Sequence, residues 1–85
     1  MDRIEPRIRE IVTNVSGVSS EAPGSADLYL DLGVASVHAL KLLTELEQSF
    51  GITIPDEDFV DATSIDKLVA LTTRLVKGAK ETADA

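Results

Sequence analysis

Residues 31–58, DLGVASVHALKLLTELEQSFGITIPDED, decide the expected fold of this chain. Between Val37 and Phe50, apolar residues recur every three or four positions, which is the spacing of one broad face of an α-helix. Gly51 follows directly and predicts a left-handed C-cap, because glycine adopts a positive φ without a steric clash. We therefore expect a central helix that begins at Ser36 and ends at Gly51.

Two further helical patterns lie on either side of this stretch. From about Arg3 to Val15, apolar residues at helical spacing are separated by Arg and Glu, which predicts an amphipathic first helix. A last helix is expected after Thr63 or Ser64, either of which is a suitable N-cap, and Phe59 lies in a short helical turn before it. The sequence therefore predicts an all-α fold: a four-helix bundle with three long helices and one short third helix.

Residues 16–35, SGVSSEAPGSADLYLDLGVA, predict a long loop between the first and second helices. The segment is rich in Ser, Gly, Pro and Ala and has no sustained hydrophobic period. Leu28, Leu30 and Leu32 alternate as in a strand, but the chain has no second strand-like segment to pair with them. We expect these three leucines to anchor the loop in the core, because long loops in compact domains are usually functional or held by their own side chains.

The length of the chain, 85 residues, accommodates one small domain. We assign this domain to residues 1–78. Residues 79–85 are expected to form a flexible tail, because they have few apolar side chains to bury.

The composition argues against several classes of function. A formal net charge of -7 disfavours nucleic acid as a partner, because nucleic acid is bound through Lys and Arg. Cysteine is absent from the sequence, so neither a disulfide framework nor a thiolate metal site is expected. No apolar run has the length of a membrane span, and the N-terminal MDRIEPRIRE lacks the apolar core of a signal peptide. We expect a cytoplasmic monomer that does not insert into membranes.

Ser36 is the candidate functional residue, and a catalytic role for it is disfavoured. A nucleophilic serine needs a base within hydrogen-bond reach, and the single histidine, His38, points to nearly the opposite side of the helix. The nucleophile-elbow pattern also requires glycine at the positions that Val34 and His38 occupy. We therefore expect no catalytic role for Ser36.

Two other roles for the Ser36 hydroxyl stay open from the residues alone. The hydroxyl is suited to an N-cap, although Ala39 stands where a capping box would place Glu or Gln. It is also suited to carry a phosphate-bearing group, because unpaired N–H groups and the helix dipole stabilise negative charge at a helix N-terminus. In that case Gly33 would let the preceding loop turn away and leave access to the group.

The acidic run PDEDFVD at residues 55–61 is expected to bind no metal. It lacks the central glycine and the closing glutamate of a calcium-binding EF-hand loop. Acidic residues at the start of a helix are stabilising without a metal ion.

The motifs of this chain strongly resemble those of the acyl carrier proteins of fatty-acid and polyketide synthesis. The most specific matches are DLG at residues 31–33, ELEQSFG at residues 45–51 and IPDE at residues 54–57, and the order of helices agrees over nearly the whole chain. The resemblance implies that Ser36 carries a covalent 4'-phosphopantetheine arm whose thiol holds acyl groups as thioesters. It also implies that the carrier itself catalyses nothing.

The partners implied by the resemblance are a phosphopantetheinyl transferase and acyl-loading, condensing or acyltransferase enzymes with basic docking patches. Two alternatives remain: a peptidyl carrier, whose arm holds an aminoacyl group, and a non-carrying interaction module with a degenerate carrier fold. The pathway could be fatty-acid, polyketide or related specialised lipid synthesis.

The chain departs from the family pattern at two places. Ala35 replaces the aspartate that usually precedes the modified serine and helps the transferase to hold its metal ion. His38 and Lys41 lie on a helix face that is usually acidic, so Glu45 and Glu47 carry its negative charge. We predict a narrow set of partners that dock on Val37, His38, Leu40, Lys41, Glu45 and Glu47.

The aliphatic interior predicts a place where an acyl chain is sheltered. An interior with few aromatic rings deforms more readily than a core of interlocked rings, and we expect the chain to enter between the central helix and the short third helix. The predicted lining is Ala39, Leu42, Leu46, Ile54, Ala62 and Leu68.

Overall fold

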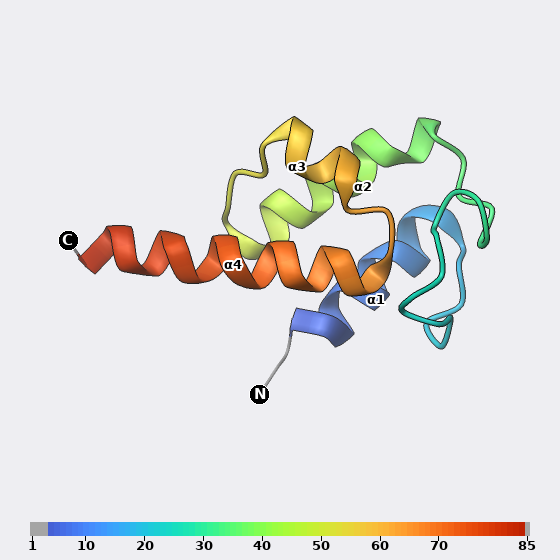
Figure 1. Ribbon diagram of the computed structural model, residues 1–85, viewed down its shortest axis with the longest axis horizontal. Helices are drawn as coiled ribbons and strands as arrows, with labels where there is room; N and C mark the ends of the chain where they lie inside the picture. The colour runs from blue at the N-terminus through green and yellow to red at the C-terminus, as the bar shows by residue number, and fades with distance from the viewer. Residues whose placement is uncertain (1–3, 85) are drawn as a thin grey trace.

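The computed structural model describes residues 4–84, with side chains as far as Gly78. Four helices make up this part of the chain, and the prediction of an all-α bundle with three long helices and one short third helix is confirmed. Figure 1 shows that α4 runs along the length of the molecule, with the long loop at one end and the C-terminus at the other. The helices are α1 (Ile4–Ser16), α2 (Val37–Phe50), α3 (Asp56–Asp61) and α4 (Ile65–Asp84).

The core lies where the apolar faces of the long helices meet. Helix α1 packs against both α2 and α4, and the short α3 packs against α4. The most deeply buried side chains come from the three long helices and from the loop, because each contributes apolar residues to a shared interior. They include Ile8, Val12, Leu28, Leu46, Ile65 and Leu68.

Local sequence signals account for the helix ends. Gly51 has φ 64° and donates its N–H to the carbonyl of Glu47, which is the expected left-handed C-cap. Ser64 rather than Thr63 caps α4, because its Oγ accepts a hydrogen bond of 3.2 Å from the N–H of Lys67. Pro55 precedes α3, whose first turn is acidic and therefore favourable at the positive end of the helix dipole.

Helix α4 extends past the predicted domain boundary. It continues to Asp84, whereas residues 79–85 were expected to lie outside the bundle as a tail. The side chains beyond Gly78 lie outside the described residues, so the flexibility of this segment stays a prediction. Within residues 4–84, the structure contains no helix with the length and apolarity needed to cross a membrane.

The expectation for Leu30 was wrong. Leu28 is fully buried and Leu32 is half-buried, but the side chain of Leu30 is 87% exposed. The cause is Asp27, whose Oδ1 accepts hydrogen bonds of 2.8 Å from the N–H groups of both Tyr29 and Leu30. This turn replaces the extended backbone in which alternate side chains share one face.

Hydrogen bonds to two helices hold the long loop in place. The N–H of Leu28 donates to the carbonyl of Thr63 at 2.8 Å, immediately before α4. Arg9 of α1 donates from its Nη1 to the carbonyls of Ser20 at 3.0 Å and Ala22 at 2.6 Å. These hydrogen bonds hold the loop against α1 and the start of α4. The position of the loop in turn determines where the backbone enters α2.

We predict that Thr72→Val stabilises the protein. Thr72 is fully buried in α4, and its Oγ1 has no hydrogen-bond partner among the described residues. Replacing an unsatisfied hydroxyl by a methyl group of the same shape should raise the free energy of unfolding by about 1 kcal/mol. Urea denaturation measures this change, and Thr73→Val at the exposed neighbouring position is the matched control. A Thr72→Val protein less stable than the native chain would contradict the prediction.

Candidate functional site

Ser36 lies immediately before α2 with its side chain exposed. Its backbone is already helical, at φ -61° and ψ -24°, and its hydroxyl makes no capping hydrogen bond with the described residues. Two backbone hydrogen bonds close the first turn: His38 N–H to the carbonyl of Ala35 at 2.9 Å, and Ala39 N–H to that of Ser36 at 3.0 Å. The hydroxyl is therefore left free, and the side-chain N-cap considered from the sequence is not formed.

The segment before Ser36 presents this hydroxyl on a fixed backbone. Gly33 has φ 75°, a backbone conformation that residues with a Cβ rarely adopt, and it turns the chain toward α2. Val34 then returns to the core, where its side chain is buried and its N–H donates to the carbonyl of Leu28 at 2.9 Å. Because Val34 is anchored, the following Ala35 and Ser36 remain exposed at a defined place.

The geometry does not support nucleophilic catalysis by Ser36. His38 is half-buried, and its Nδ1 is covered and lacks a hydrogen-bond partner among the described residues. No hydrogen bond joins Ser36 to His38 within residues 4–84, so the serine lacks the adjacent base that activation requires.

Acidic side chains do not gather into a metal site in the described part of the chain. No group of three or more His, Cys, Asp or Glu residues there is arranged to hold a metal ion. Three acidic residues of the PDEDFVD run, Asp56, Glu57 and Asp58, lie in the first turn of α3, and Asp58 also pairs with Arg74 at 3.3 Å.

The predicted docking residues fall into two groups. Val37 and Leu40 are large apolar side chains that are 76% and 71% exposed, and Lys41 is also exposed. The other three, His38, Glu45 and Glu47, are half-buried.

Glu47 has a structural contact that sequence reasoning missed. Its Oε2 accepts a hydrogen bond of 2.8 Å from the N–H of Ile54, which ties the end of α2 to the connector before α3. In the sequence, the one sign of this contact is that Glu47 lies seven residues before the IPDE segment, which begins at Ile54. This hydrogen bond therefore holds the connector against the end of α2.

The predicted acyl-pocket residues lie together in the core. Leu42, Leu46, Ile54, Ala62 and Leu68 are buried, and Ala39 is half-buried against them. They surround a packed interior that an acyl chain would have to open.

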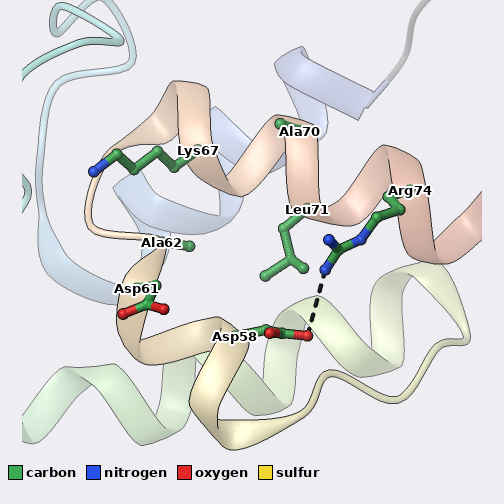
Figure 2. A pocket seen from close by; sticks show the side chains of 7 residues that line it. All are labelled: Asp58, Asp61, Ala62, Lys67, Ala70, Leu71 and Arg74. Carbon is green, nitrogen blue, oxygen red and sulfur yellow. Dashed lines mark hydrogen bonds and ion pairs between the residues drawn. The ribbon is translucent and has the colours of Figure 1, made fainter.

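An open pocket lies instead between α3 and α4, as Figure 2 shows. It has a volume of about 410 Å³, and the ion pair between Arg74 and Asp58 crosses it. Leu71 points from α4 into the gap, and Ala62 is the one residue that this pocket shares with the predicted acyl lining. The full lining is Asp58, Asp61, Ala62, Lys67, Ala70, Leu71 and Arg74.

The residues around Ser36 fit a phosphate-bearing group. The hydroxyl is exposed and uncapped, it stands at the N-terminus of a 14-residue helix, and the first turn of that helix contains no acidic residue. The helix dipole and the absence of an acidic residue from this first turn both favour a negatively charged phosphodiester. A small helical bundle with such a serine at the start of its second helix has the features of a carrier protein.

A comparison with protein families identifies the class. The sequence model of the family described as "Phosphopantetheine attachment site" matches residues 6–72, which is well over half of the chain. The protein therefore belongs to this family of carrier proteins, and its cofactor is covalently attached 4'-phosphopantetheine. Carrier domains of this family are modified by a phosphopantetheinyl transferase and deliver their cargo to partner enzymes.

The charge of Asp27 contributes to the loop that places Ser36. The hydrogen bond from the N–H of Leu30 has the largest effect and lowers the pKa of Asp27 below its ordinary value of 3.8. Burial opposes this change. The N–H of Tyr29, the side-chain hydrogen bond of Thr63 and the positive charge of Lys67 lower the pKa further. A lowered pKa means that the folded state favours the carboxylate, so its contribution to stability is complete above 3.8 and is lost as the pH falls through the lowered value.

We predict that the native chain and Asp27→Asn differ in their free energy of unfolding, and that this difference depends on pH. The Asn side chain keeps an amide oxygen as acceptor but loses the charge. The native chain should be the more stable at about pH 6, and the difference should shrink toward about pH 3 as the carboxylate is protonated. Urea denaturation at both values measures it. Glu21→Gln, at an exposed position in the same loop, should show no such change. A difference independent of pH would mean that the charge of Asp27 has no role.

Proposed function

We propose that Ser36 carries the 4'-phosphopantetheine arm and that the protein holds acyl intermediates on it as thioesters. The proposal rests on one observation: the hydroxyl of Ser36 is exposed and free of a capping hydrogen bond at the start of α2. In the transfer from coenzyme A, the Ser36 oxygen bonds to the phosphorus beside the pantetheine as the pyrophosphate bond breaks. The hydroxyl proton passes to the transferase or solvent, and adenosine 3',5'-bisphosphate leaves.

In this proposal the protein is a carrier and not an enzyme. Acyl-loading, condensing or acyltransferase enzymes of fatty-acid, polyketide or related specialised lipid synthesis would act on the thioester. Exposed Val37 and Leu40, one and four residues after Ser36, provide apolar contact beside the arm. Acidic residues of the chain, including Glu45, would steer partners with basic patches, in keeping with the net charge of -7. A cytoplasmic location and a monomeric state complete the proposal.

Two alternatives predict different behaviour of the arm. A peptidyl carrier would hold an aminoacyl group, and mass analysis of the thioester cargo from the native host would identify it. A non-carrying interaction module would hold no arm, and Ala35 favours this alternative because its methyl group cannot ligate the metal ion of a transferase.

We predict that the native chain gains one phosphopantetheinyl group slowly. The metal ion also has ligands from the transferase, the coenzyme A phosphates and water, so Ala35 should slow the transfer without preventing it. Intact mass after incubation with coenzyme A and a transferase measures the gain. Ala35→Asp should react about ten times faster or more, which corresponds to about 1.4 kcal/mol in the barrier, and Ser36→Ala should not react.

Two results would contradict this assignment. Failure of the native chain with several transferases, including one from its own host, would favour the non-carrying module. Gain of the group by Ser36→Ala would show that the arm is attached elsewhere.

We also predict that a medium-length acyl chain on the arm enters the core between α2 and α3. Each buried methylene would contribute about 0.8 kcal/mol at best, before the cost of opening the packed interior. The acylated form should therefore have a higher thermal midpoint than the unacylated holo form, with amide shifts at Leu42 and Leu46. Shifts confined to Ala70 and Leu71 would place the chain in the pocket between α3 and α4, and unchanged shifts and midpoint would exclude sequestration.

A further inference from the structure

A groove between α1 and α2 is lined by two cationic side chains and one carboxylate, on a chain whose net charge is -7. Its volume is about 180 Å³. Its sides combine apolar, amide and charged groups from the two helices: Arg7, Ile11, Asn14, Val15, Lys41 and Glu45.

The positive charge of Arg7 in this groove already has protein partners. Its Nε donates to Ser49 Oγ at 2.7 Å, which links α1 to α2, and its Nη1 pairs with Glu10 at 2.8 Å. These contacts hold the guanidinium at the groove and leave it little freedom to turn toward another molecule.

Lys41 has no such partner. It is exposed and makes no hydrogen bond or ion pair with any residue in the described part of the chain. Glu45 follows one turn later, but the order lysine then glutamate is the less favourable one for an ion pair within a helix. Lys41 is therefore a cation at the groove whose charge the fold does not neutralise.

The outward face of α2 also lacks an acidic group to compete for Lys41. Its exposed residues are apolar, hydroxyl, amide or cationic: Val37, Leu40, Lys41, Thr44 and Gln48. Glu47 is engaged with the N–H of Ile54, and Glu45 lines the groove on the side of α1. A partner that covers the apolar pair Val37 and Leu40 would meet one exposed charge on this face, the positive charge of Lys41, while the half-buried Glu45 lies beside it in the groove.

We propose that Lys41 binds a carboxylate of the partner enzyme that docks on α2, with the side chain of that acidic residue lying in the groove between α1 and α2. The proposal rests on the proposed function, because it takes the start of α2 as the docking surface. Ile11 and Val15 give the groove an apolar side, and a charge pair is stronger beside apolar groups than in open water.

The phosphopantetheinyl transferase of the native host is the probe, because it must reach Ser36 and so must dock beside α2. Its KM and kcat are measured for the native chain, Lys41→Ala, Lys41→Glu and Lys77→Glu, a matched charge reversal at an exposed position on α4. Lys41→Glu should raise KM by about 10-fold with kcat unchanged, as expected for the loss of about 1.4 kcal/mol of binding. Lys41→Ala should give a smaller increase, and Lys77→Glu should stay within about twofold.

The outcomes separate this inference from the proposed function. If the native chain gains no mass at saturating transferase, the attachment at Ser36 fails. If it gains the group but Lys41→Glu has an unchanged or lower KM, the attachment stands and the carboxylate contact is overturned. A Lys41-dependent dimer, measured by light scattering, would show that a second copy of this acidic chain occupies the groove, and that result would also overturn the proposal.

Discussion

The contact that the site depends on most is made by Leu28. Its side chain is fully buried in the core, and its N–H donates to the carbonyl of Thr63 directly before α4. This residue divides a long segment of irregular chain into two shorter ones, each with little freedom of its own. The carbonyl of the same residue accepts the N–H of Val34, so one core residue determines where the backbone enters α2 and where Ser36 is exposed.

The acidic residues of this chain have several distinct roles, which net charge alone does not reveal. Asp27 accepts two backbone hydrogen bonds inside the loop, Glu47 accepts one from the connector before α3, and Asp58 pairs with Arg74 across a pocket. The carboxylates in these contacts support local structure. Lys41, in contrast, is unpaired within residues 4–78, where side chains are described. The one charge among the exposed residues of α2 is therefore positive, although the net charge of the chain is -7.

The prediction for the loop shows the limits of a pattern of alternating residues. The alternation of Leu28, Leu30 and Leu32 correctly indicated that apolar side chains tie the loop to the core, but it placed Leu30 on the wrong side. Alternation determines direction only in extended backbone, and the carboxylate of Asp27 forms a turn there by capturing the N–H groups of Tyr29 and Leu30. Asp27 was visible in the sequence, but the bridge that places it against Ser64, far along the chain, was not.

The sequence by itself determined the helices, their order, the left-handed cap at Gly51 and the family to which the chain belongs. These features depend on local periodicity, on the conformational freedom of single residues and on short motifs, all of which are contained in neighbouring positions. Only the tertiary structure decided that the Ser36 hydroxyl is free of a cap, that Glu47 binds a backbone amide and that the open pocket lies beside α4. The physical reason is that hydrogen bonds and cavities of this kind form between segments brought together by packing, and residue spacing alone does not specify those distances.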